Sequence, residues 1–270
     1  MIVSILGCGW YGRALAGKLL EKGFVVKGSA TSCVKVQELK QLGISPYLVC
    51  FTEDGHSYDP DFFKCDVIIV ALPPGFKKGV GALYLKKIQG IIEAIVAQGK
   101  TKAIYISSIG VYGDQNKEVD ETDEPEPDSE SGEILLEAEK LFQNKAGLKT
   151  TIIRFGGLVG PGRNPARFFS GKSNIPNGRA PINLIHQSDC VSITEAIIRT
   201  NTFGVTINAC APDHPGKADC YRKMATRAKL PLPQFIDELK GWKVVNSINL
   251  NNKINYQFTV NSWKDYMPDT

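Results

Sequence analysis

The first 21 residues, MIVSILGCGWYGRALAGKLLE, carry the strongest structural signal in the chain. An apolar run over residues 1–6 leads directly into Gly7, Gly9 and Gly12, which are spaced as G-x-G-x-x-G. In such a loop the first glycine permits a tight turn, the second admits a ligand, and the third lets the following helix pack on the strand. We therefore predict a strand, a glycine loop and a helix over residues 10–21, whose N-terminus binds the pyrophosphate of a dinucleotide.

Strand-like and helix-like segments alternate through the first 155 residues. The strand-like segments are short, continuous apolar runs, which are typical of parallel strands covered by helices on both faces. Strands are predicted at residues 1–6, 24–28, 46–51, 66–72, 103–108 and 150–155, and helices at residues 10–21, 34–41, 84–98 and 129–141. This alternation predicts an α/β fold, a Rossmann-type doubly wound parallel sheet.

The regular alternation weakens after Gly156. We expect an NAD(P)-binding Rossmann domain over residues 1–160. Residues 161–270 are expected to form mostly a small C-terminal α/β substrate lobe, with the segment 182–210 returning to the Rossmann core.

Three segments have a less regular pattern. A helix is predicted near residues 217–228, and the closing stretch 242–260 is interpreted as a hairpin-like pair of strands. The acidic run EVDETDEPEPDSE at residues 118–130 is interpreted as a solvated loop.

The composition is that of a globular protein. Of the 270 residues, 43% are hydrophobic and 22% charged, and the net charge of +4 is too small to indicate nucleic-acid binding. The longest apolar run, residues 67–72, falls far short of the ~20 residues of a membrane span. Seven widely spaced cysteines without a CxxC pair indicate reduced thiols and no metal site. We expect a cytoplasmic protein that binds a small molecule and neither nucleic acid nor a membrane, and a homodimer is compatible with the sequence.

The end of the second predicted strand bears on the choice of cofactor. A site for NAD usually carries Asp or Glu about 20 residues after the glycine loop, where it binds the ribose 2′-hydroxyl. This chain instead has Ser29, Thr31 and Ser32, with Lys35 nearby and no acid before Glu38. Hydroxyls and a cation suit a 2′-phosphate, so NADP is favoured over NAD; the alternative is a turn with helix-capping serines.

Several motifs occur in an order that resembles a known family. The glycine loop is followed by SSIGVYG at 107–113, the acidic loop, RFGGLVGPGR at 154–163 and HQSDC at 186–190. Over nearly its whole length the chain resembles the extended, atypical short-chain dehydrogenase/reductase (SDR) superfamily, the NAD-dependent epimerase/dehydratase type. The resemblance implies that the cofactor is bound by Gly7, Gly9, Trp10, Tyr11, Gly12, Ser29, Thr31, Ser32, Ala71, Leu72, Pro73, Ser107, Phe155 and Gly156.

The resemblance breaks at the catalytic pair. Family members use a Ser or Thr after the fifth strand, matched here by Ser108, and a Tyr-x-x-x-Lys pair on the next helix. Aligning Gly132 and Glu139 on the family pattern puts Ser131 at the tyrosine and Leu135 at the lysine. No tyrosine in the chain has a lysine four residues later, so the departure does not depend on the alignment. Without a lysine-tuned tyrosine, the family's acid–base chemistry loses its proton donor.

Few residues are candidates to replace the missing catalytic pair or to bind the substrate. Tyr112 is the candidate replacement acid beside Ser108, and His186 matches a family segment that packs near the substrate cleft. Four cations, Arg163, Arg167, Lys172 and Arg179, are expected to cluster in the substrate lobe, where Arg163 and Arg167 would contact an anionic substrate.

Three hypotheses follow. The first is an oxidoreductase or epimerase on a nucleotide-sugar or small carbonyl substrate with a non-standard catalytic site. The second is a non-catalytic NADP-binding sensor or partner-binding protein. The third is a structural protein that merely retains the fold, against which the intact glycine loop argues.

Overall fold

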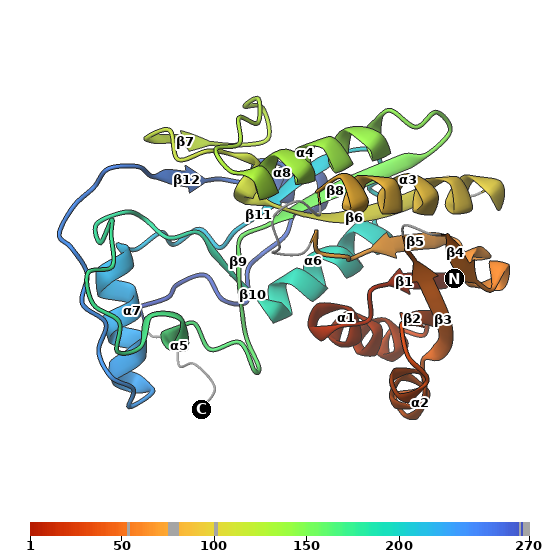
Figure 1. The fold of residues 1–270 in the computed structure, drawn as a ribbon, viewed down its shortest axis with the longest axis horizontal. Coiled ribbons are helices and arrows are strands. Elements are labelled where there is room, and N and C mark those ends of the chain that lie inside the picture. The colour runs from red at the N-terminus through yellow and green to blue at the C-terminus, as the bar shows by residue number, and fades with distance from the viewer. Residues whose placement is uncertain (53–54, 75–80, 100–101, 265, 267–270) are drawn as a thin grey trace.

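The computed structural model describes residues 1–52, 55–74, 81–99, 102–264 and 266 (Figure 1). Its central feature is a sheet of eight described strands in the order β11-β8-β6-β5-β1-β2-β3-β4. These strands are β1 (Ile2–Leu6), β2 (Val25–Ala30), β3 (Ser45–Phe51), β4 (His56–Tyr58), β5 (Val67–Val70), β6 (Lys102–Ser108), β8 (Lys149–Phe155) and β11 (Thr206–Ala209).

The sheet is parallel except at one edge, where β4 pairs antiparallel with β3. Strand β1 lies between β2 and β5, so the chain winds outward in one direction from β1 to β3 and in the other from β5 to β11. A doubly wound sheet of this kind has its ligand crevice at the carboxyl ends of the strands flanking the reversal. The predicted Rossmann-type sheet is confirmed.

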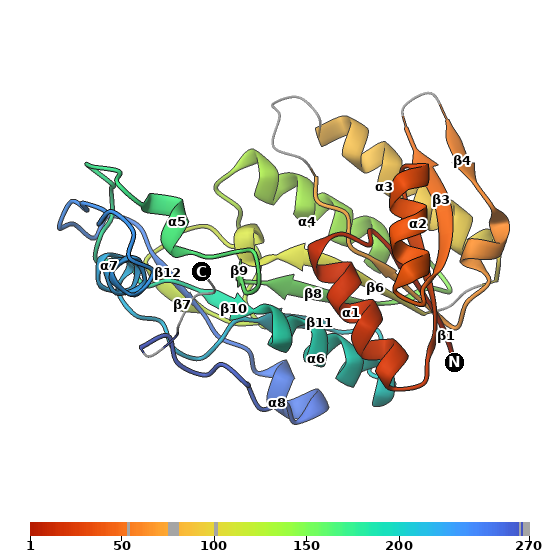
Figure 2. The same cartoon turned by 90° about the horizontal axis from the view of Figure 1, so that it is seen from below.

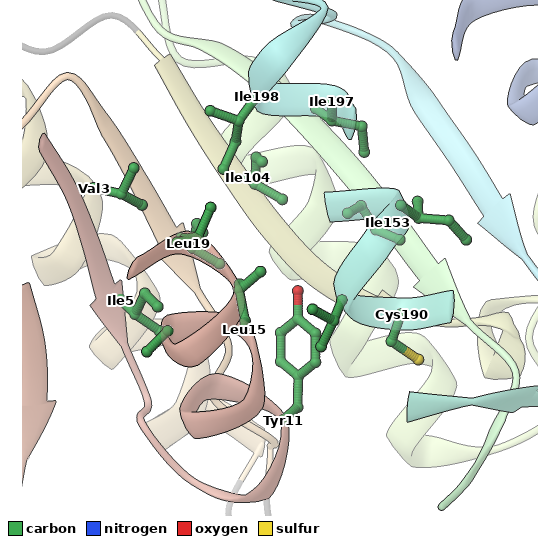
Figure 3. Close-up of a cluster of buried hydrophobic side chains, with 14 of the residues drawn as sticks. Val3, Ile5, Tyr11, Leu15, Leu19, Ile104, Ile153, Cys190, Ile197 and Ile198 are labelled. Carbon is green, nitrogen blue, oxygen red and sulfur yellow. The ribbon is translucent and has the colours of Figure 1, made fainter. Parts of the chain in front are cut away.

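Helices cover both faces of the sheet (Figures 1 and 2). One face is covered by α1 (Trp10–Glu21), α2 (Cys33–Gln41) and α6 (Gln187–Arg199), and the other by α3 (Gly81–Ala97) and α4 (Glu130–Gln143). Figure 3 shows Leu15 and Leu19 of α1 packed between the strands and the α6 residues Ile197 and Ile198. Each face therefore has its own apolar core, and the glycine loop lies at the end of β1 between these packed layers.

A smaller group of elements lies at one end of the sheet (Figures 1 and 2). It contains β7 (Lys117–Val119), β9 (Gly157–Val159), α5 (Ala166–Phe169), β10 (Leu184–His186), α7 (Lys217–Arg227) and β12 (Lys243–Val245). The short helix α8 (Asn249–Ile254) instead packs beside β11 and α6 in the core of the large sheet layer. Its apolar core includes Met224 of α7 and the buried Trp263. Segment 182–210 supplies β10, α6 and β11, of which α6 and β11 pack in the large sheet layer. The domain boundary at residue 160 stays a prediction.

The interpretation of 242–260 as a hairpin-like pair is wrong. Strand β12 pairs in parallel with β7, more than 100 residues upstream, and the following residues form α8. The Ser247 hydroxyl accepts a hydrogen bond from the Leu250 N–H (3.2 Å) at the start of that helix. A three-residue strand whose partner is distant in the sequence leaves no local pattern, so periodicity could not reveal the pairing.

The acidic run is also more structured than a solvated loop. Val119 is buried in β7. The Glu121 carboxylate accepts hydrogen bonds from the Asn208 N–H (2.8 Å), the Ser247 hydroxyl (2.8 Å) and the Ile248 N–H (2.9 Å). Glu121 thus ties the acidic run to the end of β11 and to the start of α8, which corrects the sequence interpretation for this part of the run.

None of the seven cysteines, all of which lie in the described ranges, forms a disulfide bond. Within the described ranges, no group of three or more His, Cys, Asp or Glu side chains is arranged to hold a metal ion. The described helices also include none with the length and apolar character needed to span a membrane.

Candidate functional site

The glycine loop between β1 and α1 is shaped by close backbone contacts. Gly7 has a φ of +106°, and a Cβ there would lie 2.5 Å from the carbonyl oxygen of Ala71. A Cβ on Gly12 would lie 2.4 Å from the carbonyl oxygen of Gly7, so this glycine allows α1 to pack on the loop. Gly9 is different, because no described atom lies within 4 Å of its Cβ position. Its missing side chain leaves space open for a ligand.

The N-terminus of α1 has the properties of an anion site. No side chain caps it at Gly9, and its first turn contains no acidic residue. The free N–H groups and the positive end of the helix dipole therefore face the loop without a competing carboxylate. The Gly7 N–H donates to the Ser29 hydroxyl (2.8 Å), which fixes the loop against the end of β2.

Two adjoining cavities open beside this loop, one of about 760 Å³ and one of about 480 Å³. Both are lined by Gly7, Gly9, Trp10 and Leu72, so they form one continuous cleft. The larger cavity lies toward β2 and β3 and the smaller toward β6 and β8, on opposite sides of β1 and β5. The cleft therefore crosses the reversal point of the sheet, where doubly wound folds bind dinucleotides.

The larger cavity contains part of the predicted ribose site. Ser29 and Thr31 line it together with Lys35, whereas Ser32 is the N-cap of α2 and accepts from the Lys35 N–H (3.5 Å). The Ser29 hydroxyl is already engaged by Gly7. Of the three predicted residues, Thr31 is thus the one that lines the cavity and whose hydroxyl takes no part in the hydrogen bonds just described.

Sequence reasoning missed two cations in the larger cavity, Arg13 and Lys87. Arg13 follows the last glycine of the loop directly, and its guanidinium forms an ion pair with Glu38 of α2. Its position one residue after the motif was a readable signal, but its direction into the cavity depends on the packing of α1 against α2.

The smaller cavity gathers most of the other predicted residues. Gly7, Gly9, Trp10, Tyr11, Gly12, Ala71, Leu72, Pro73, Ser107, Ser108, Phe155, Gly156 and Arg163 all line it. Ser131 and Leu135 of α4 line the same cavity, facing it with Ser108 at the end of β6. The two residues that the resemblance aligns with the family's Tyr and Lys thus share a cavity with the aligned serine.

The smaller cavity lacks a proton donor suited to neutral pH among its described lining residues. Its ionisable side chains there are Tyr11 and Arg163. The Tyr11 hydroxyl points toward α6 (Figure 3) and bonds to Thr194 (2.7 Å), and burial raises the pKa of Tyr11 far above its ordinary value. Arginine keeps its proton at all physiological pH values. The described lining can orient ligands through hydroxyls and one guanidinium, but it provides no tuned acid or base.

The structure argues against Tyr112 as the replacement acid. Its side chain is buried and absent from the described lining of both cavities. Its hydroxyl accepts from Arg154 Nη1 (2.6 Å) and donates to the carbonyl of Asp120 (2.9 Å). Burial raises the pKa of Tyr112, which makes it a weaker acid. The sequence places Tyr112 close to Ser108, but the turn after β6 directs the two side chains to different surroundings.

A buried ion pair, also missed, lies behind the cleft. The Glu139 carboxylate of α4 accepts from Arg154 Nη2 (2.6 Å) and Nε (3.1 Å), and from the Ser107 hydroxyl (2.5 Å). Both charged side chains are buried, and Arg154 also donates to Tyr112. The network joins α4, β6 and β8, and so holds the wall that carries Ser107 and Ser108.

The predicted substrate residues do not gather in one place. Arg163 lines the smaller cavity with its guanidinium 4.5 Å above the Trp10 ring, whereas Arg167 is exposed on α5 and absent from the described linings. Lys172 lies over the Phe169 ring, and Arg179 pairs with Asp237 (3.3 Å) beside a separate cavity of about 310 Å³. The four cations thus have different described surroundings, and their role in binding an anionic substrate stays a prediction.

His186 lies at the edge of the cleft rather than in its described lining. Its Nδ1 accepts from the Ser188 N–H (3.2 Å) and caps α6, and its ring packs against Tyr266. A Cβ at Gly160 would lie 3.4 Å from His186 Nε2 and 3.3 Å from the Trp10 ring, so the histidine approaches the cleft behind this glycine.

Comparison with known proteins agrees with this geometry. Residues 7–181 match the model of the NAD(P)H-binding family. The chain is 33% identical to Protein YeeZ of Escherichia coli (strain K12) over 266 residues, which cover 95% of each protein. Among solved structures, it resembles a functionally unknown conserved protein from Silicibacter pomeroyi, with a TM-score of 0.78, 22% identity and coverage of 97% and 95%.

It also resembles the UDP-glucuronic acid 4-epimerase of Bacillus cereus in complex with NAD, with a TM-score of 0.78 and 20% identity. The match covers 96% of this chain and 94% of the epimerase. At this identity the likeness is one of fold. The matched glycine loop, the continuous cleft at the reversal of the sheet and the near full-length relative lead to one conclusion. The chain belongs to the NAD(P)H-binding family and is a homologue of Protein YeeZ.

Proposed function

We propose that the protein binds NADP(H) and a second small ligand in its continuous cleft without the hydride transfer that ordinary SDR enzymes catalyse. One observation carries this proposal. The cavity that would hold the nicotinamide is lined by Ser131 and Leu135, which the resemblance aligns with the family's acid and lysine, and its described lining provides no tuned proton donor. The protein then acts as a cofactor-dependent sensor or partner-binding protein.

The charges of the larger cavity support NADP over NAD. Its described lining contains the cations Arg13, Lys35 and Lys87 and no carboxylate. A site for NAD normally holds the ribose 2′-hydroxyl with a carboxylate at the end of the second strand, and here that strand ends at Ala30. Positive charge near the ribose favours a 2′-phosphate.

The chemistry of the smaller cavity supports a small anionic or hydroxylated second ligand. Ser108 and Ser131 provide hydroxyls that accept or donate hydrogen bonds, and Arg163 provides a guanidinium at the mouth beside Trp10. Leu135 and Leu158 supply apolar surface between them.

A second candidate function is an oxidoreductase or epimerase that acts on a nucleotide sugar or small carbonyl compound. The observation in its favour is Ser108, which lines the cavity and which the resemblance matches to the family's catalytic serine; its hydroxyl also accepts a hydrogen bond from the Gly110 N–H (3.1 Å). A serine alone can orient a carbonyl or hydroxyl group, but it is not acidic enough to protonate it at neutral pH. The reaction would then depend on water as the proton source.

Restoring the missing pair tests the proposal. The variant Ser131→Tyr/Leu135→Lys is expected to raise NADPH oxidation above the wild-type residual rate by about 10²–10⁴-fold, the usual contribution of a general acid. The measurement is the absorbance at 340 nm with a panel of alcohols, ketones and nucleotide sugars.

The matched control is Ser131→Phe/Leu135→Met, which fills the same space without an acid or a charge, and it should leave the rate at the wild-type level. Robust wild-type turnover would refute the proposal, and its loss in Ser108→Ala would then favour the second candidate function.

A further inference from the structure

The ion pair between Arg13 and Glu38 lies at the ribose end of the larger cavity. Arg13 is in the first turn of α1, and Glu38 is on α2, the helix that follows β2. The Arg13 guanidinium contacts the Glu38 carboxylate, and its Nε donates to the carbonyl of Cys8 (3.3 Å). The side chains are 37% and 45% exposed, so both remain accessible to solvent.

The surroundings of the pair are those of a phosphate site. Arg13 lines the cavity with Thr31 and Lys35, while its partner Glu38 is absent from the described lining. A guanidinium matches the geometry of phosphate oxygens and binds them through paired hydrogen bonds. An ion pair this exposed to water is held only weakly. A phosphate dianion that enters the cavity can therefore replace the carboxylate as the partner of Arg13.

We propose that Arg13 is the residue that selects NADP(H) over NAD(H). Glu38 sets the strength of that selection, because its carboxylate competes with the 2′-phosphate for the Arg13 guanidinium. Binding of the 2′-phosphate exchanges the Glu38 carboxylate for phosphate oxygens on the same guanidinium. The inference rests on the proposed cofactor site and adds the pair of residues that tune it. Because NADH has no 2′-phosphate, its affinity should be almost independent of both side chains.

The test compares cofactor affinities by nicotinamide fluorescence in three variants. Arg13→Gln should lower the affinity for NADPH by about tenfold or more, equivalent to about 1.4 kcal/mol. It should change the affinity for NADH by no more than about twofold. Glu38→Gln should tighten NADPH several-fold, because the competitor is removed. In the variant with both substitutions, the gain from Glu38→Gln should disappear, because Glu38 acts through Arg13.

Lys18 and Glu21 provide a matched control on the same helix, since they form an exposed pair 3.9 Å apart and are absent from the described lining of the cavity. Lys18→Gln should leave the ratio of NADPH to NADH affinity unchanged. Arg13→Lys retains the charge without the planar fork and should give an intermediate ratio.

Two fragments localise the effect. 2′,5′-ADP carries the 2′-phosphate and 5′-AMP lacks it, so Arg13→Gln should weaken the binding of 2′,5′-ADP and leave the binding of 5′-AMP unchanged. The inference is overturned if Arg13→Gln lowers both cofactor affinities equally, or if Glu38→Gln weakens NADPH. A wild-type protein that binds neither cofactor would instead refute the proposed function, so the two failures are distinguishable.

Discussion

A Gly9→Val variant is expected to lose NADPH binding by about 100-fold or more while the protein stays folded. Gly9 has an ordinary φ of −84°, and no described atom lies within 4 Å of its Cβ position, so the structure accommodates a side chain there. That side chain would occupy the space above the N-terminus of α1, where the pyrophosphate contacts backbone N–H groups. Each lost hydrogen bond to a charged group is worth about 1.5–3 kcal/mol, and ~1.4 kcal/mol is tenfold in affinity.

The measurement is a fluorescence titration together with a thermal melt. Gly17→Ala is the matched control, because Gly17 is an exposed glycine in the same helix with open space around it. It should leave binding unchanged and stabilise the helix slightly. Gly12→Ala should instead lower the melting temperature, because its Cβ would meet the carbonyl of Gly7. Wild-type affinity in Gly9→Val would show that the cofactor does not bind along this loop.

A Glu139→Gln variant is expected to lower the free energy of unfolding by about 3–5 kcal/mol, the usual cost of removing one partner from a buried ion pair. Glu139 is 0% exposed, and its carboxylate accepts from Arg154 and Ser107. The amide is similar in shape, so the loss reflects the charge of Arg154 left without its counterion rather than a cavity. Urea denaturation measures the change.

Glu137, on the same helix but with an exposed side chain, provides the control. It pairs with Lys140 at 2.8 Å, but both side chains are more than half exposed. Glu137→Gln should therefore cost at most about 1 kcal/mol. Equal effects of the two substitutions would mean that the Glu139–Arg154 pair does not stabilise the wall of the cleft.

The architecture was largely predictable from sequence because its signals are local. Continuous apolar runs, the glycine spacing and helical periodicity place β1, β2, β3, β5, β6 and β8 close to where the structure has them, and α1 is predicted with its observed bounds of Trp10 and Glu21. The helix predicted near residues 217–228 is likewise confirmed as α7. These elements depend on side chains within a few positions of one another.

The missed features depend on residues distant in the sequence. Pairing of β7 with β12 joins segments more than 100 residues apart, and neither strand is long enough to show a period. The Glu139–Arg154 pair looks like ordinary helix and strand charges until α4 packs on β8. Tyr112 was considered as an acid because it follows Ser108 closely, but its surroundings are decided by Arg154 and Asn208. Proximity in the chain says little about which way a side chain points after a turn.

The most direct test of the account is an equilibrium titration of the wild-type protein with NADPH and, separately, with NADH, followed by nicotinamide fluorescence. The account predicts saturable binding of one cofactor per chain, with NADPH bound more tightly than NADH by about tenfold or more. The reason is that the described lining of the larger cavity contains cations and no carboxylate. Absence of binding, or equal or tighter binding of NADH, would contradict it.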